Sequence, residues 1–548
     1  MKRLKIIQGI SLLNMRKANG LLIVLTCMLL PFAGVSQMWT QIGADIHGEA
    51  IGDGAGSSID MSHDGTRVVV GAPNNNGGGL NAGHVRAYEL IGSTWVQLGS
   101  DIEGPVVNQF LGRKVRMSGD GNRIAIGHHG SDYRGYVKVY EYAGGSWNQI
   151  GQEILGAQSG DRADKVNLDF DGNTLAVGAA INLASIGYTR VYNFNGTSWS
   201  QIGGTINGEQ TGDQFGSSLS LNSAGNRLIV GGPNNDGTSS SANNNCGHAR
   251  VYEFNSTNWV QLGGDIDGEW NPTGIGGGAG GSVDINGVGN VVVLGATSQH
   301  GGGFFRGQVQ VYSYNGTSWN QIGSDIHGQF DFDRIGWNVS ISVDGTSIAF
   351  GAFCGTPNGC ARVYEFDGSD WSQVAANIDG EHVGDGRNIK TSLNIDGSRV
   401  AVGTPNNPNP AFDPPTQPGQ ARIFDLQNCN ITGIDVQTAC NSFTWIDGNT
   451  YTSSNNTATY TIPGGAADGC DSMLNVSLSF IPAGQSTLDT TVCEGGTILF
   501  NGTLYDQSNT SGTERLIGQS ASGCDSIVEV TLSFFPLAEG NLDTTICA

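Results

Sequence analysis

The chain has 548 residues, of which 86 are glycine and only 14% are charged, and its formal net charge is −23. This composition favours short strands joined by many tight turns, and no convincing amphipathic helix follows the N-terminal region. The excess of negative charge repels phosphate backbones, so nucleic acid is excluded as an expected partner.

Residues 1–37 have the pattern of an export signal. A basic stretch that starts at Met15 precedes the apolar run Leu21–Leu30, and small residues follow this run. The run is shorter than the about 20 residues needed to cross a bilayer, which disfavours a membrane-spanning anchor. We therefore expect a secreted protein that is extracellular or held at the cell surface.

A segment of the type WxQIGxDIxGE recurs seven times after the signal. Its tryptophans are separated by 56, 52, 52, 60, 60 and 52 residues and are Trp39, Trp95, Trp147, Trp199, Trp259, Trp319 and Trp371. Each period holds four apolar segments separated by turn residues such as Asn-Gly and Asp-Gly, which is typical of one propeller blade. Seven equivalent tryptophans indicate a packing role more than a stacking platform for sugars.

The number of strands predicts how the array closes. The seventh period ends at "ARIFDL" without a tryptophan strand, whereas the first tryptophan strand, Trp39–Gly43, has no period before it. An N-terminal strand that completes the last blade removes an open sheet edge. The predicted fold is therefore all-β, with a seven-bladed β-propeller over residues 38–427 that the N-terminal strand closes.

Charged residues recur on the third strand of the period. Basic and acidic residues stand three positions apart, as in Arg86 and Glu89 or Arg250 and Glu253. Residues at this spacing face opposite sides of a strand. We expect the basic group of one blade to pair with the acidic group of the next.

Two quoted segments carry a resemblance to a known family. "SHDGTRVVVGAP" at Ser62–Pro73 and "GDQFGSS" at Gly212–Ser218 resemble the FG-GAP repeat of integrin-α-like propellers. The whole period is similar to repeats in exported surface proteins of Bacteroidota. The resemblance covers the seven periods and implies the propeller fold, but it implies no particular activity.

The same resemblance implies a calcium site, because in that family the loop before the second strand often binds calcium through clustered oxygen ligands. The residues at the matching positions are Asp60, Ser62 and Asp64 in the first blade and Asn167, Asp169 and Asp171 in the third. Val68 and Leu175 stand where the family has a closing acid, and neither can ligate. A plain Asp-Gly turn is the alternative, and no cofactor is required.

Long loops between the second and third strands are expected to share one face of the disc. Variable loops on a rigid scaffold are the usual place for recognition. The candidate ligand contacts in these loops are Asn243, Phe304, Phe305 and Phe412, with a plain linker as the alternative.

The search for catalytic residues gives one departure from the repeat. Asp331 and Asp333 in "FDFDR" break the pattern, as the carboxylates of a single active site should. Solvation of a loop explains them equally well. No nucleophile or metal-binding histidine motif is present at the required spacing.

A different repeat follows Gln427. Residues 428–486 and 487–541 are each expected to form a small β-sandwich-like module, and residues 542–548 the truncated start of a third. Cysteines of exported proteins commonly form disulfides. Proximity in sequence predicts the pairs Cys440 with Cys470, Cys493 with Cys524 and, in the sixth blade, Cys354 with Cys360. The modules resemble those of large Bacteroidota adhesins, so the chain is expected to be a piece of a longer surface protein.

Together these features predict a monomeric, non-enzymatic surface protein for adhesion or recognition, whose partner is an extracellular glycan or protein. Two alternatives stay open, a carbohydrate-active propeller enzyme (a glycosidase or lyase) and a structural spacer. An axial pocket with two facing carboxylates absent from other blades favours the enzyme. The lack of any concave or aromatic surface on the long-loop face favours the spacer.

Overall fold

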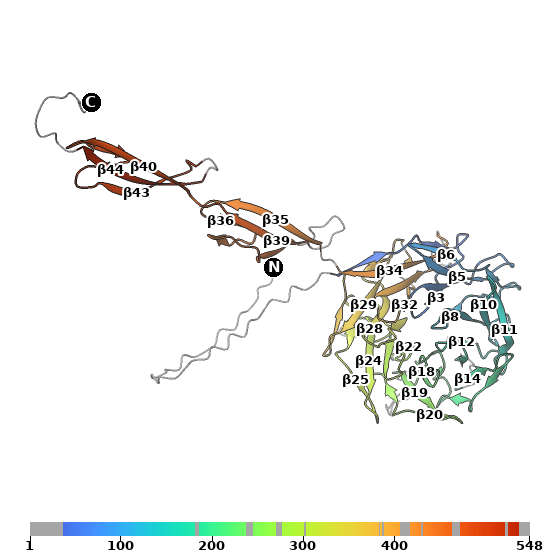
Figure 1. The fold of residues 1–548 in the computed structure, drawn as a ribbon. Coiled ribbons are helices and arrows are strands. Elements are labelled where there is room, and N and C mark those ends of the chain that lie inside the picture. Colours follow the sequence, from blue (N-terminus) through green and yellow to red (C-terminus); the bar gives the residue numbers. More distant parts are fainter. Residues whose placement is uncertain are drawn as a thin grey trace, which may run out of the picture. The chain divides into compact units, whose positions relative to one another are not determined.

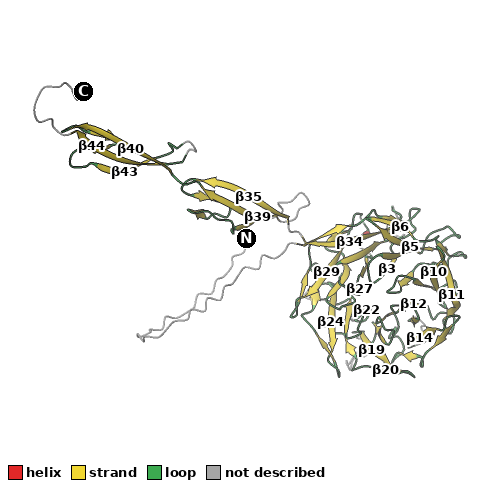
Figure 2. Ribbon diagram, in the orientation of Figure 1, coloured by secondary structure: helices red, strands yellow, loops and turns green. Residues whose placement is uncertain are grey.

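A computed structural model describes most of the chain after the export signal. The described residues are 37–180, 186–236, 245–269, 277–300, 303–382, 384–385, 388–405, 417–428, 431–462, 472–520 and 524–535. They are built of strands and turns (Figure 2). In the described part, no helix is long and apolar enough to cross a membrane.

The first period folds into an antiparallel meander. Its strands are β3 (Ser58–Met61), β4 (Arg67–Ala72), β5 (His84–Ile91) and β6 (Thr94–Gln97), and the short β7 (Ile102–Glu103) adds to β5. Turns such as Asp64-Gly65 join the strands, and Gly65 has a φ of 70°, which a glycine adopts without strain.

The same meander repeats in the next three sheets. The second contains β8 (Lys114–Met117), β9 (Arg123–His128), β10 (Tyr136–Ala143) and β11 (Ser146–Leu155). The third contains β12 (Ala163–Leu168), β13 (Thr174–Ala179), β14 (Tyr188–Phe194), β15 (Trp199–Gln201) and β16 (Ile206–Asn207). The fourth contains β17 (Ser218–Leu221), β18 (Arg227–Gly232), β19 (His248–Phe254), β20 (Trp259–Gln261) and β21 (Ile266–Asp267).

Three further sheets follow, so the described residues hold seven of this kind. The fifth contains β22 (Ser282–Ile285), β23 (Val291–Ala296), β24 (Gln308–Tyr314), β25 (Trp319–Gln321) and β26 (Ile326–His327). The sixth contains β27 (Val339–Ile341), β28 (Ser347–Ala352), β29 (Cys360–Phe366), β30 (Trp371–Gln373) and β31 (Ile378–Asp379). The seventh contains β32 (Lys390–Leu393), β33 (Arg399–Thr404) and β34 (Gln420–Asn428), with β1 (Gln37–Gln41) and β2 (Ile46–His47).

The last of these sheets takes its outer strand from the start of the described chain. β1 pairs antiparallel with β34, and Trp39 stands opposite Leu426. The innermost strand of each sheet touches that of the next sheet, and β32 touches β3. The sheets therefore radiate from one axis (Figure 1), the arrangement of a β-propeller.

The core lies between the sheets. Alternate residues of β4 face different neighbours, because Val68 and Val70 pack with Ile423 of the seventh sheet, whereas Val69 packs with Val115 of the second. A strand buried on both faces reads as a continuous apolar run, as the second strands do. Burial at about 25 cal/mol per Å² of apolar area is the main stabilising contribution, and each sheet obtains it only from its neighbours.

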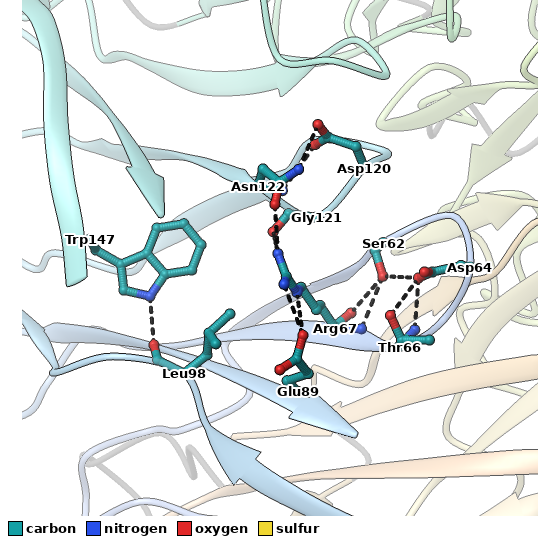
Figure 3. A network of polar contacts seen from close by, with 10 residues as sticks. All are labelled: Ser62, Asp64, Thr66, Arg67, Glu89, Leu98, Asp120, Gly121, Asn122 and Trp147. Atoms are coloured by element: carbon teal, nitrogen blue, oxygen red, sulfur yellow. Dashed lines mark hydrogen bonds and ion pairs between the residues drawn. The ribbon is translucent and has the colours of Figure 1, made fainter. Parts of the chain in front are cut away.

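The seven repeat tryptophans link neighbouring sheets, which confirms their packing role. Trp147 Nε1 donates a hydrogen bond to the Leu98 carbonyl oxygen at 2.7 Å (Figure 3). Trp39 makes the equivalent bond to Val374 at 3.3 Å. The others are Trp95 to Ile42, Trp199 to Ile150, Trp259 to Ile202, Trp319 to Leu262 and Trp371 to Ile322.

The predicted ion pairs between third strands are wrong. Glu89 pairs with Arg67 of its own sheet at 2.8 Å, because the two residues stand directly opposite each other on β5 and β4. Arg67 also reaches the next sheet, where Nη1 donates to the Gly121 carbonyl oxygen and to Asn122 Oδ1 (Figure 3). Arg86 pairs with Asp101 instead of an acid on the next third strand.

The C-terminal region contains two further units. In the first, β35 (Ile431–Ala439) pairs parallel with β39 (Ser472–Phe480), β38 (Thr459–Ile462) pairs antiparallel with β39, and β36 (Phe443–Thr444) with β37 (Thr450–Tyr451) forms a hairpin. In the second, β40 (Gly484–Cys493), β44 (Ser526–Phe535) and β43 (Ser511–Leu516) form the sheet, and β41 (Ile498–Phe500) with β42 (Thr503–Tyr505) the hairpin. In each unit the hairpin packs on the sheet.

The predicted disulfides are partly wrong. Cys354 and Cys360 are bonded, as predicted. Cys440, however, is bonded to Cys524, 84 residues away, which excludes both other predicted pairs. Proximity in sequence failed because the bond joins the end of β35 in one module to the residues before β44 in the next. Cys493 is also disulfide-bonded, and Cys470 lies outside the described residues.

Candidate functional site

The meander gives the disc two different faces. The turns that follow the first strands lie on one face, which we call the turn face. The loops that follow the second strands lie on the other, the loop face, together with the first residue of each innermost strand. The innermost strands, among them β3, β8, β12 and β22, surround the axis of the disc (Figure 1). They line two cavities there, which we together call the axial channel.

Polar side chains on the innermost strands form hydrogen bonds to neighbouring sheets. Ser58 Oγ accepts a hydrogen bond from the Val115 backbone N–H at 3.0 Å, and Asp60 Oδ2 accepts one from Met117 at 2.9 Å. The same bond is made by Asn167 to Leu221, Ser282 to Val339, Asp284 to Ile341, Asn338 to Thr391 and Ser340 to Leu393. Side chains at two positions of the innermost strand, those of Ser58 and of Asp60, therefore accept hydrogen bonds from the next sheet.

Three innermost strands carry lysine at the position that Ser58, Ser282 and Asn338 occupy in other sheets. Lys114, Lys165 and Lys390 begin or border the loop-face end of β8, β12 and β32 and line a cavity of about 90 Å³. We call these residues the lysine layer. Sequence reasoning missed them, although aligning the first strands of the seven periods gives Ser, Lys, Lys, Ser, Ser, Asn and Lys at this position.

The surroundings of Lys114 and Lys390 disfavour the charged form of their ammonium groups. Burial, together with the charges of Lys390 and Lys165, lowers the pKa of Lys114 well below its usual range. Burial and the charge of Arg116 lower the pKa of Lys390 to about 8. Lys165 differs because its ammonium pairs with Asp164.

Two carboxylates of innermost strands and one guanidinium line the deeper part of the channel, and Asp169 also borders it. Asp60, Asp284 and Arg116 line a second cavity of about 90 Å³ toward the turn face. Burial raises the pKa of Asp284. The hydrogen bonds that its oxygens accept from Ser220 and from the Ile341 backbone act in the opposite direction but are weaker. Both oxygens of each carboxylate are hydrogen-bonded, since Asp60 also accepts from Ser392 Oγ.

An aromatic pocket opens on the loop face between the sixth and seventh sheets. We define it by Phe332, Arg334, Trp337, Phe353 and Ile389, and its volume is about 790 Å³. Trp337 is 50% exposed and Phe332 is 54% exposed. Trp337 lines both this pocket and the cavity of the lysine layer, so the two are adjacent.

Two of the predicted ligand contacts lie beside this pocket. The Phe305 ring stacks on Phe332 with ring centroids 6.0 Å apart, and Phe304 is 60% exposed on the same loop. The Phe332 backbone N–H donates to the Phe304 carbonyl oxygen at 2.7 Å. The other two, Asn243 and Phe412, lie outside the described residues.

The predicted calcium ligands serve turns and contacts between sheets. Asp64 Oδ1 accepts hydrogen bonds from Ser62 Oγ and Thr66, and Asp60 faces the axial channel instead of this turn. The equivalent set behaves alike, with Asn167 bonded to Leu221, Asp169 to Thr174 and Asp171 to Asn173. Calcium binding by these residues stays a prediction.

Two other clusters have the composition of metal sites. Among the described residues, Glu49, His84 and Asp101 form one, and the equivalent Glu209, His248 and Asp265 form another. Each histidine is buried and its Nδ1 has no hydrogen-bond partner. The carboxylates, however, already pair with Arg86 and Arg250, so the clusters are ion-pair networks.

The predicted catalytic acids are not brought together as a free pair. Asp331 pairs with Arg306 at 3.0 Å. Asp333 is fully buried, accepts backbone N–H bonds from Gln329 and Phe330, and lies 3.6 Å from Arg362. Asp53, Asp213 and Asp385 cap the equivalent loops in the same way. Asp333 is therefore a repeat feature.

Comparison with known proteins adds little to this description. No family model and no curated protein matches the chain. Among solved structures, a chain of the mitotic checkpoint complex is 13% identical, with a TM-score of 0.45 over 70% of this chain and 94% of that one. The RRP9 WD40 repeats are 12% identical, with a TM-score of 0.45 over 71% and 100%. The hydrazine synthase of Kuenenia stuttgartiensis is 13% identical, with a TM-score of 0.44 over 67% and 96%. The class of protein, an all-β propeller, accordingly rests on the sheet topology of this chain.

Proposed function

We propose that the chain is an exported, non-enzymatic, monomeric surface protein that recognises an extracellular glycan or protein. In this proposal the seven sheets are the blades of a ring that β1 closes, the repeat is of the FG-GAP kind, and the C-terminal units are small two-layer β-sandwiches. The pairing of β1 with β34 and the Trp39 bond to Val374 support the closed ring.

One observation carries the recognition function, namely the aromatic pocket. A cavity of about 790 Å³ is within the range of ligand pockets, which combine apolar walls with a few polar groups. Trp337 and Phe332 supply exposed ring faces, and Arg334 supplies a charged donor. Such rings bind the apolar faces of sugars or anchor side chains of a protein partner. A spacer has no need for this surface.

A carbohydrate-active enzyme is the second candidate, and one observation favours it. Asp60 and Asp284 share the axial channel and have no acidic counterpart at this position of the other sheets. A hydrolase or lyase needs such a carboxylate pair. Release of reducing ends from extracellular polysaccharides, abolished in Asp284→Asn, is the result that supports this candidate. Hydrogen bonding of all four oxygens opposes it.

Replacing Trp337 with alanine is expected to weaken ligand binding at least tenfold with little change in stability. The side chain is 50% exposed, so its removal leaves the core intact but takes away a large contact face. A glycan and matrix-protein screen, with and without chelator, identifies the ligand, and titration then compares the variants.

The matched control is Phe170→Ala, which removes an exposed ring from the turn face, 5.3 Å from the ring of His63. It is expected to bind as the wild type does. A wild-type protein that binds nothing in the screen, or equal loss in both variants, would contradict recognition at the aromatic pocket.

A further inference from the structure

The residues of the lysine layer cannot form the hydrogen bond that other residues at the same strand position accept. In three of the other sheets Ser58, Ser282 and Asn338 accept a backbone N–H from the next innermost strand, whereas Ser218 of the fourth sheet donates to the Gly280 carbonyl oxygen. An ammonium group has three donors and no acceptor, so lysine cannot make this bond. Three departures of one kind at one level of the channel therefore need another reason.

The chain contains few lysines, and most of those that follow the N-terminal signal lie in the lysine layer. It has seven lysines, of which Lys2, Lys5 and Lys17 belong to the N-terminal signal. Three of the remaining four form the lysine layer. The fourth, Lys138, lies on β10 away from the axis and pairs with Glu153 at 3.7 Å. In a chain of net charge −23, positive charge is thus gathered at one end of the channel.

Two of the three ammonium groups form no ion pair with a described residue, although the charge of Asp164 also acts on Lys114. Within the described residues, no carboxylate lies within 4.0 Å of Lys114 Nζ or Lys390 Nζ, whereas Asp164 neutralises Lys165. Like charges that are gathered in a half-buried cavity repel one another. Burial and the neighbouring positive charges lower the pKa of both groups, and for Lys114 they outweigh the opposite effect of the Asp164 charge.

We propose that Lys114, Lys165 and Lys390 bind an oxyanion with at least two negative charges, in the form of a sulfate or carboxylate group. The cavity of about 90 Å³ has room for such a group, because about 10–15 Å³ of such volume suffices for one water molecule. The side-chain Oδ1 of Asn338 accepts the Thr391 N–H, so the NH₂ group of the same side chain can serve as a further donor. This site goes beyond the proposed recognition function, since it uses other residues and does not require the aromatic pocket.

The test is calorimetric titration of the full chain without its signal, at constant ionic strength, with two probes. Inorganic sulfate tests a free ion, and a sulfated disaccharide tests the same group on a larger ligand. We expect at least one probe to bind. Lys114→Met and Lys390→Met are each expected to weaken binding at least tenfold, and Lys138→Met, the matched control, to leave it unchanged.

A second measurement separates lost binding from lost folding. Without ligand, Lys390→Met is expected to unfold at the same temperature as the wild type or higher, because the substitution removes a half-buried charge that has no ion-pair partner among the described residues. Between pH 7 and 9 the affinity should fall, because the Lys390 ammonium loses its proton near pH 8. Lys390→Arg should still bind at pH 9. The charged groups around Lys390 in the channel are Lys114, Lys165, Asp164, Arg116, Asp60 and Asp284.

The outcomes distinguish this site from the recognition function. Disaccharide binding that the lysine variants lose but Trp337→Ala keeps supports the anion site as a site separate from the aromatic pocket, whose recognition function the glycan and matrix-protein screen tests. Sulfate binding lost in the lysine variants supports the anion site equally. The proposal is overturned if neither probe binds the wild type, or if Lys138→Met weakens binding as much as Lys390→Met does.

Discussion

Deleting Gln37–Gln41 is expected to destabilise the whole propeller by at least about 3–5 kcal/mol, the usual effect of removing one packed tryptophan. The deletion removes β1 and with it the packing of Trp39 against Ile378, Leu393 and Phe424. It also removes the Trp39 bond to Val374 and exposes the edge of β34. An exposed strand edge pairs readily with other chains, so aggregation should accompany the loss of stability. Unfolding in denaturant and size-exclusion chromatography measure the two effects.

A circular permutation supplies the control for this deletion. Moving residues 37–47 to follow Asn428 through a short turn returns the missing strand to β34 within one continuous meander. The permuted protein is expected to recover most of the lost stability, because the same pairing forms without closing a ring of nearly 400 residues. Equal stability of the deleted and wild-type proteins would mean that β1 contributes nothing to the ring.

Features that repeat were predictable from the sequence. The period of the tryptophans, the turn residues and the continuous apolar second strands each appear seven times, so chance agreement is small. Trp39 could be assigned to the end of the array only by counting strands, because its partner Leu426 is far away in the chain. Local patterns therefore sufficed for the sheets and the packing role of the tryptophans.

Pairings between side chains were harder to predict. Arg67 and Glu89 face each other because of strand register, which the spacing of charges along one strand does not reveal. The lysine layer was missed because each lysine occupies an ordinary strand position, and its meaning emerges only when three blades meet at the axis. Cys440 was paired wrongly because its partner belongs to the next module.

Replacing Cys440 with serine is expected to destabilise the C-terminal modules by about 2–4 kcal/mol while leaving the propeller unchanged. The bond to Cys524 closes a long loop, and cross-links across long loops restrict the unfolded chain most. Cys440→Ser, Cys524→Ser and the double variant should therefore be equally unstable, since each lacks the same bond. Scanning calorimetry of the full chain resolves the module transition from that of the propeller.

The bond between Cys354 and Cys360 provides the matched comparison for this experiment. It spans only six residues within the sixth sheet, so Cys354→Ser should have a smaller effect, confined to the propeller transition. Mass spectrometry of non-reduced peptides tests the connectivity directly. A peptide that joins Cys440 to Cys470 would contradict the bond between modules. A peptide that joins Cys440 to Cys524 would confirm that the bond cross-links consecutive modules, so that their stabilities are coupled.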